Sequence, residues 1–310
     1  MIRQMGALWP LIPLPFLILG LTFFTQSQHL VQLHNYEVGQ KLYSANRFEE
    51  ALRVLLPVAE YGKFPDIQND VGVLYYSGKG APQNLERAAY WLHQSASQGY
   101  TLGMYHFGLL RMDGEGVAKD LIDGMAWIRK AAEKGHMDAC HRYALYHYDG
   151  KLAPRNPKLA APWFERLVKR NDPRGLLPLA SMLLQGDGVP RDVTRAVQLL
   201  NTAAAAGSTG ALDQLGRLYL KGEAVAADLP KAARYFQQSA QRGSLEGTNQ
   251  LAIMLAQGQG VVKNPHLARV LFQRAAQGGH PQARKNLATL ETLIHPPPPP
   301  PRPHGAEPTP

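Results

Sequence analysis

The apolar and small residues of this chain recur with a constant period of 36 residues, which is typical of proteins built from stacked helical units. In each successive unit a large apolar residue directly precedes a small one: Val71-Gly72, Phe107-Gly108, Tyr143-Ala144, Leu179-Ala180, Leu215-Gly216, Leu251-Ala252 and Leu287-Ala288. A small residue also stands three positions before a large one, as in Gly124 and Trp127, and this spacing puts both on one helical face. The pattern predicts pairs of helices that approach closely at their small residues. Trp91, Trp127 and Trp163 are expected to fill space between units.

Glycines and short polar residues mark the predicted ends of these helices. A glycine column, suited to the left-handed turn that ends a helix, comprises Gly78, Gly114, Gly150, Gly186, Gly222 and Gly258. Six residues later stands a residue able to accept hydrogen bonds from the first turn of a helix: Asn84, Asp120, Asn156, Asp192, Asp228 and Asn264. A second column of helix stops comprises Gly99, Gly135, Asn171, Gly207, Gly243 and Gly279. In the first unit these columns predict helices near Ile67 to Ser77 and Leu85 to Gln98.

The combined columns closely resemble the Sel1-like repeat, a subfamily of the tetratricopeptide-like helical hairpins. The second unit matches best, at Phe107-Gly108, Gly114-Glu115-Gly116-Val117, Asp120, Trp127, Ala131-Ala132 and Gly135. The resemblance extends over six units, from about Phe64 to Gly279. It implies a right-handed superhelix that serves as a non-enzymatic scaffold or adaptor in protein complexes.

The expected fold is all-α, a right-handed α-solenoid of helical hairpins with an N-terminal hydrophobic segment. We predict a membrane anchor or signal segment at 1–28, a tetratricopeptide-like capping hairpin at 30–63, six repeats at 64–279 and a C-terminal capping helix at 280–294. Residues 295–310 contain a proline run that favours the polyproline II conformation over a packed core, so this tail is expected to be disordered.

The N-terminal stretch predicts an association with a membrane. Residues 5–24 carry no charged side chain, and a helix of about 20 apolar residues can cross a bilayer. Because Arg3 precedes this stretch and the next charged residue is Glu37, the amino end should stay in the cytoplasm and the repeats should lie on the exported, periplasmic side. Pro13 and Pro15 leave a shorter apolar stretch of signal-peptide length, so an uncleaved anchor and a cleaved signal followed by release are both open.

The third unit departs from the repeat pattern. Leu152 stands where other units have glycine. Pro162 falls inside its second helix and Pro178 inside the next helix, and the loss of a backbone hydrogen bond at each predicts bent helices and a change of curvature between them. This unit also gathers aromatic and basic residues suited to contacts with a partner, and the candidate set is Tyr146, His147, Tyr148, Arg155, Lys158 and Arg166.

The composition narrows the function classes. A total of 33 Lys and Arg against 24 Asp and Glu gives a net charge of +9, but these basic residues are scattered, so no nucleic-acid partner is expected. Cys140 is the only cysteine, which excludes an internal disulfide. His136, Cys140 and His147 fall near one helical face but lack a third strong ligand, so no metal, cofactor or enzymatic activity is predicted.

Two hypotheses for the function follow. The first is a scaffold that binds partner proteins in a cell-envelope assembly or signalling complex, with an extended surface rather than a reactive pocket. The alternative is a module that binds a cell-wall glycan or an acidic exopolysaccharide through the basic and aromatic residues of the third unit.

Overall fold

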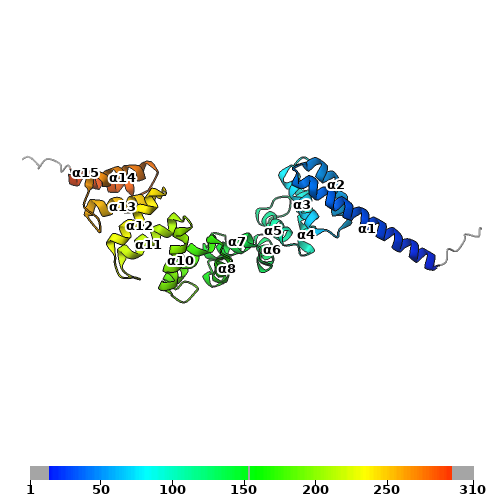
Figure 1. The fold of residues 1–310 in the computed structure, drawn as a ribbon, viewed down its shortest axis with the longest axis horizontal. Helices are drawn as coiled ribbons and strands as arrows, with labels where there is room; N and C mark the ends of the chain where they lie inside the picture. The colour runs from blue at the N-terminus through cyan, green and yellow to red at the C-terminus, as the bar shows by residue number, and fades with distance from the viewer. Residues whose placement is uncertain (1–13, 153, 295–310) are drawn as a thin grey trace, which may run out of the picture. The chain divides into compact units, whose positions relative to one another are not determined.

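The computed structural model describes the backbone of residues 14–152 and 154–294, and all regular structure within these ranges is helical (Figure 1). Fifteen α-helices and one 3₁₀ turn follow one another there, with no strand. The expected all-α solenoid of helical hairpins is therefore confirmed. The chain divides into two compact parts, Met1–Tyr143 and Ala144–Pro310, and the division falls inside helix α7 (Met137–Tyr148). From here on "first unit" and "second unit" mean these two parts, each of which holds several repeats. The expectation of disorder for the tail 295–310 lies outside the described residues.

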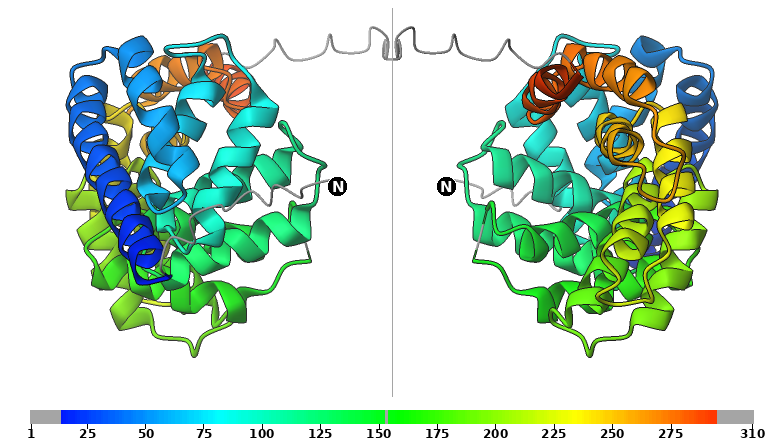
Figure 2. Two further views of the ribbon diagram at one scale, coloured as in Figure 1. Left: turned by 90° about the vertical axis from the view of Figure 1, so that its right-hand side faces the viewer. Right: turned by 90° about the vertical axis from the view of Figure 1, so that its left-hand side faces the viewer.

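The first unit contains a long N-terminal hairpin followed by two regular hairpins. Helix α1 (Leu14–Ser44) is a single continuous helix, seen in blue in Figure 2, and it packs against α2 (Phe48–Tyr61). The regular hairpins pair α3 (Pro65–Ser77) with α4 (Leu85–Ser97), and α5 (Thr101–Asp113) with α6 (Leu121–Glu133). Helix α3 also contacts α5 directly, so the first helices of neighbouring hairpins form one layer.

The second unit begins with the last turn of α7 and is also built of helical hairpins. Its helices are α8 (Pro157–Lys169), α9 (Leu176–Gln185), α10 (Val193–Ala205), α11 (Thr209–Lys221), α12 (Leu229–Gln241), α13 (Leu245–Gln257), α14 (Pro265–Gln277) and α15 (Ala283–Ile294). Here too the first helices contact one another, α11 against α13 and α13 against α15. The final helix α15 therefore covers the end of the layer formed by α11 and α13.

The helix ends lie where the capping residues and glycines stand. Each side-chain oxygen in the column Asn84, Asp120, Asn156, Asp192, Asp228 and Asn264 accepts a hydrogen bond from the backbone N–H three residues later, at 2.9 to 3.3 Å. The column Gly78, Gly114, Gly150, Gly186, Gly222 and Gly258 has φ between +68° and +81°. Five of these glycines directly follow a first helix, whereas Gly150 lies two residues after the end of α7.

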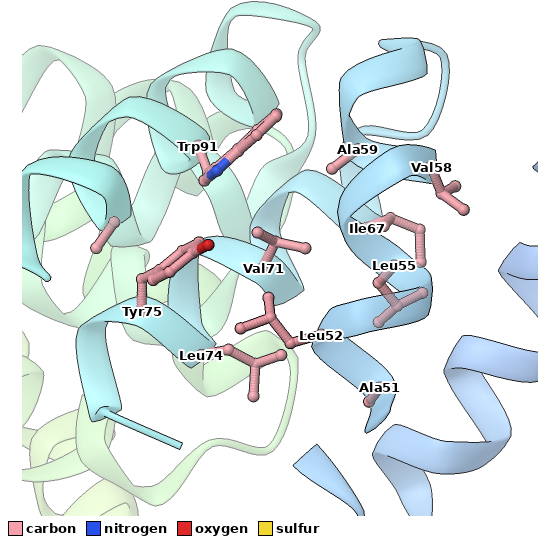
Figure 3. Packing of buried hydrophobic residues seen from close by; sticks show 11 residues of the cluster. Ala51, Leu52, Leu55, Val58, Ala59, Ile67, Val71, Leu74, Tyr75 and Trp91 are labelled. Carbon is pink, nitrogen blue, oxygen red and sulfur yellow. The ribbon is translucent and has the colours of Figure 1, made fainter. Parts of the chain in front are cut away.

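Apolar residues of α2 and α3 form the core at the start of the first unit (Figure 3). Leu52 and Leu55 of α2 belong to one buried cluster with Val71 of α3. Within the hairpins the small residues bring the backbones together, because a Cβ atom added to Gly108 on α5 would lie 2.9 Å from the carbonyl oxygen of Gly124 on α6. The close approach predicted from the small positions is therefore present in this hairpin.

A loop glycine connects each of several hairpins to the hairpin before it. Gly80, Gly116, Gly188 and Gly260 all have positive φ and lie against the first residues of a preceding second helix. A Cβ atom added to Gly116 would lie 2.0 Å from the carbonyl oxygen of Leu85, the first residue of α4. Leu152 and Ala224 occupy this position in the third and fifth repeats, and neither has a positive φ. Their loops therefore follow a different backbone path.

Of the two prolines of the central repeats, Pro162 lies in the helix interior as expected, whereas Pro178 lies in the first turn of its helix. Pro162 does lie inside α8, which continues through it from Pro157 to Lys169. The prediction that Pro178 interrupts a helix interior is wrong, because the chain forms a 3₁₀ turn at Pro173–Gly175 and Pro178 is the third residue of α9. An N–H in the first turn of a helix has no intrahelical partner to lose. The change of curvature between these prolines stays a prediction.

The predicted membrane segment lies partly outside the described residues, since residues 1–13 are not among them. Helix α1 begins at Leu14, with Pro15 in its first turn, where a missing N–H is tolerated. None of the helices within residues 14–152 and 154–294 is both long and apolar enough to cross a membrane. Anchoring and localisation therefore stay predictions.

Candidate partner-binding surfaces

The first helices of the hairpins carry polar side chains that hydrogen-bond from one hairpin to the next. In the first unit His106 on α5 and Asn69 on α3 are joined by a hydrogen bond of 2.8 Å. In the second unit Asn286 on α15 donates to Asn249 on α13 at 2.9 Å. These two pairs occupy the same positions of the repeat. In each unit we call the layer of first helices that carries such a pair the first-helix surface, and these side chains are fixed by one another before any partner binds.

The beginning of the first-helix surface is acidic, because Asp66 and Asp70 lie on α3. The Tyr36 hydroxyl donates to Asp66 at 2.8 Å, and this bond together with burial raises the pKa of Tyr36 to about 12. Gln40 donates to Asp70 at 2.9 Å. Burial nevertheless raises the pKa of Asp70, since it outweighs the hydrogen bonds that favour the carboxylate. This part of the surface suits cationic groups of a partner.

A depression of about 230 Å³ lies between α3 and α5 on this surface. Its lining includes the apolar Val73 and Leu109, the half-exposed Tyr76, and the carboxylates of Asp113 and Glu115. It combines apolar side chains with these two carboxylates, and Arg142 of α7 also lines it. Because the carboxylates exceed the single guanidinium, the depression can receive the stem of a lysine or arginine side chain and pair with its charge.

A second depression of about 330 Å³ lies between α9 and α11 in the second unit. It is lined mainly by polar side chains, among them Gln185, Gln214, Arg217 and Lys221. Gln214 donates to Ser181 at 2.8 Å, which fixes its amide across the two hairpins. Glu223 also lines it, so two cations face one carboxylate and the depression suits acidic groups.

Glu246 organises the neighbouring part of the second unit. Its carboxylate lies 3.0 Å from His280 Nε2 and 3.7 Å from Arg217. Burial alone would raise the pKa of Glu246, but hydrogen bonds from His280 and Gln250 and the charge of Arg217 lower it below its ordinary value. Glu246 is therefore ionised at neutral pH and holds Arg217 at the edge of the depression.

Two of the six candidate residues predicted in the third repeat, Tyr148 and Arg155, contact each other. Arg155 donates to the backbone oxygen of Tyr148 at 2.9 Å and its guanidinium lies over the Tyr148 ring, while both of its terminal nitrogens bind the carboxylate of Asp187. Tyr148 in turn packs edge-on against the buried Phe164, with ring centroids 5.5 Å apart. The charge of Arg155 is thus matched within the protein, which weakens its role in binding an acidic polymer.

The other four candidates are Tyr146, His147, Lys158 and Arg166. The rings of Tyr146 and His147 meet at 5.0 Å, and burial lowers the pKa of His147. Arg166 lies over the Trp163 ring, 5.9 Å from its centroid, and Lys158 is exposed on α8. The role of all six residues in partner binding stays a prediction.

A groove on the first unit was missed by the sequence analysis. We call it the aromatic groove, defined by Tyr90 and His93 of α4, Phe107 of α5 and Trp127 of α6, and its volume is about 540 Å³. Trp127 was expected to fill space between repeats, yet it is only half-buried and lines this groove, whereas Trp91 is 8% exposed. The spacing of three between Tyr90 and His93 was a visible signal, but their direction required the structure.

The repeats of this chain match a known protein family. A family model of the Sel1 repeat matches residues 65–100, 101–136, 138–172, 177–208, 210–244 and 245–280. The chain belongs to the Sel1 repeat family. Sel1 repeat proteins typically mediate protein–protein interactions, and this scaffold family is generally non-catalytic.

Two solved structures resemble this Sel1 repeat protein. One is a protective antigen of uropathogenic Escherichia coli with an SLR fold, at 30% identity and a TM-score of 0.68. The match covers 78% of this chain and 52% of the antigen, so this chain spans about half of the antigen's length. The other is a Sel1 repeat protein from Oxalobacter formigenes, at 30% identity and a TM-score of 0.61, over 78% of this chain and 96% of that one. Among curated proteins, no sequence is significantly similar to this chain.

Proposed function

We propose that this protein is a scaffold that binds a partner protein on its first-helix surface. The supporting observation is the layer of contacting first helices, whose polar side chains are fixed by hydrogen bonds between hairpins such as that of His106 with Asn69. A fixed polar layer with shallow depressions offers many contacts over an extended area, which is how stacked-repeat proteins bind their partners. In the first unit, Asp66 and Asp113 favour a partner segment that carries Lys or Arg.

We further propose that the scaffold acts in a cell-envelope assembly or signalling complex, with its repeats on the exported side. The support is the uncharged stretch at residues 5–24 with Arg3 before it. Fusing a reporter that is active only outside the cytoplasm to the end of the chain would test this. Activity is expected for the complete chain and not for a chain without residues 1–28, and an inactive complete fusion would overturn the proposed location.

Photo-crosslinking in intact cells would test the binding surface. A photoreactive amino acid at Tyr76, which lines the depression between α3 and α5, should give adducts with a partner protein. The matched control is Val270 on α14, which is 57% exposed but lies on a second helix. Equal yields at both positions, or adducts at Val270 alone, would contradict the proposal.

The alternative of binding an acidic polysaccharide is not favoured by any observation on the described residues. It depends on the positive charges of Arg155, Lys158 and Arg166, and Asp187 already neutralises Arg155. Glycan binding that falls steeply with salt and disappears when these three residues are changed to alanine would revive it.

A further inference from the structure

We propose that the second helices of the second unit bind an anionic lipid bilayer. The surface consists of the basic and the exposed aliphatic side chains of α8, α10, α12 and α14, and we call it the basic surface. These helices are different from α9, α11, α13 and α15, which form the first-helix surface of this unit. The inference therefore does not depend on the proposed scaffold role.

The charge of the second helices differs between the two units. In the first unit, α2, α4 and α6 carry four basic and six acidic residues. In the second unit, the only acidic residue within α8, α10, α12 and α14 is Glu165. Basic residues that are scattered along the sequence thus gather on one set of neighbouring helices. These eight basic residues are Lys158, Arg166, Lys169, Arg195, Lys231, Arg234, Arg269 and Arg274.

Half of these cations have no acidic partner within residues 14–152 and 154–294. Arg195 pairs with Glu165 at 2.6 Å, and Arg269 pairs with Glu291 at 2.6 Å. Cations that are exposed and unpaired keep their full attraction for anionic groups outside the protein. The four residues of this kind are Lys158, Lys169, Arg234 and Arg274.

Exposed aliphatic side chains lie among these cations. Leu159 on α8 is 46% exposed, and Leu267 and Val270 on α14 are 43% and 57% exposed. Leu267, Val270 and Arg274 follow one another at spacings of three and four residues, so they lie on one side of α14. Aliphatic side chains beside a basic helix face are the combination with which helices bind at the interface of a membrane.

Contacts between neighbouring helices hold the basic surface together. Both terminal nitrogens of Arg195 on α10 donate to the carboxylate of Glu165 on α8, at 2.6 and 2.7 Å. The hydroxyl of Tyr235 on α12 donates to Asn201 on α10 at 3.2 Å. The loop before α14 packs at Gly260 against the first residue of α12. The four helices therefore form one row, whose side chains can contact a bilayer together.

A lipid bilayer suits both components of this surface. Each Lys or Arg near an anionic bilayer strengthens binding about fivefold. Exposed aliphatic side chains can enter the boundary between headgroups and acyl chains, and the long stems of Lys and Arg let their charged ends stay in water. An acidic polypeptide or a nucleic acid would use the charges but would give Leu267 and Val270 no apolar environment. The combination favours a bilayer.

Sedimentation of the full chain with vesicles tests the role of charge. Vesicles of phosphatidylcholine that also contain phosphatidylglycerol should bind the chain more tightly than vesicles of phosphatidylcholine alone, and the difference should shrink at high salt. Residues 1–28 are present in each comparison, so any contribution that does not depend on lipid charge cancels. The combined changes Lys158→Glu, Arg234→Glu and Arg274→Glu should weaken binding to the anionic vesicles at least about tenfold.

A matched control changes the net charge equally in the first unit. The combined changes Arg53→Glu, Arg87→Glu and Arg129→Glu place one substitution on each of α2, α4 and α6. This variant should weaken binding less than about threefold. Equal losses of affinity in the two triple variants would overturn the proposal, because net charge rather than the basic surface would then determine binding.

A fluorescent probe tests whether the aliphatic side chains reach the bilayer, even where residues 1–28 already hold the chain on the vesicle. A polarity-sensitive fluorophore attached to Val270→Cys should shift its emission to shorter wavelengths on anionic vesicles. The matched control is Ile122→Cys on α6, since Ile122 is 82% exposed in the first unit. Cys140 is buried, so the label should react with the introduced cysteine. No shift at Val270→Cys, or an equal shift at Ile122→Cys, would overturn the proposal.

The double variant Leu267→Ser with Val270→Ser separates a bilayer from an acidic polymer. It keeps every charge of the basic surface, so it should bind poly-glutamate as the wild type does but should lose at least about fivefold in affinity for anionic vesicles. An unchanged affinity for the vesicles would overturn the proposal. If poly-glutamate or a DNA duplex also bound the wild type as tightly as the vesicles do, the basic surface would be a site for acidic polymers instead.

Discussion

Replacing Gly116 with alanine is expected to loosen the contact between the first and second repeats. Gly116 has a φ of +68°, a conformation that costs alanine about 1–2 kcal/mol. Its new Cβ atom would also lie 2.0 Å from the carbonyl oxygen of Leu85 and 2.8 Å from the amide nitrogen of Glu86. These atoms belong to the first turn of α4 and cannot move aside as a flexible side chain would. Overpacking of this kind costs about 1–3 kcal/mol, so the total loss should be about 2–5 kcal/mol.

The variant Gly99→Ala separates the two contributions. Gly99 lies in the same unit and has a φ of +85°, but the nearest atom to its added Cβ is the flexible Lys134 Nζ at 3.4 Å. It should therefore lose only the backbone contribution of about 1–2 kcal/mol. Urea denaturation followed by circular dichroism measures both losses. Native-state hydrogen exchange should show that Gly116→Ala lowers protection mainly in α4 and α5.

Equal losses of stability in the two variants, within about 0.5 kcal/mol, would refute the reasoning, since the contact with α4 would then contribute nothing measurable. A loss of protection confined to helices other than α4 and α5 would refute it as well. Either result would mean that the loop adapts to a Cβ atom at this position, as the loops that carry Leu152 and Ala224 do.

Three further predictions concern single side chains, each measured by urea denaturation. Asp192→Ala should cost about 1 kcal/mol, because the N–H of Arg195 loses its acceptor, and Asp192→Asn should keep most of that stability. Burial lowers the pKa of His106, so the wild-type protein should lose stability as the pH falls below about 6.5, where the unfolded chain binds a proton that the folded chain excludes. His106→Asn, which can still bond to Asn69, should show a shallower slope, and the part due to His147 should remain. Glu165→Gln should cost less than about 1 kcal/mol and less still at high salt, because its ion pair with Arg195 is partly exposed; a larger loss, or one independent of salt, would contradict that view.

The repeat architecture was determined by local features of the sequence. Capping residues such as Asn84 and glycines such as Gly78 act through backbone groups within a few residues of themselves. Their positions therefore predict where helices begin and end without knowledge of distant contacts. The expectation failed at Pro178 because the start of its helix depends on a 3₁₀ turn that the repeat columns do not encode.

The binding surfaces depended on contacts between residues far apart in the chain. Arg155 looked like an available cation, but Asp187, 32 residues later, neutralises it. Trp127 looked like a packing residue, and only the positions of α4, α5 and α6 show that its ring borders an open groove. By itself, the sequence determined the hairpins and their order, because caps and periodic apolar positions act locally. Only the tertiary structure decided which side chains are paired and which are accessible, because that depends on the helices of neighbouring repeats that pack beside them.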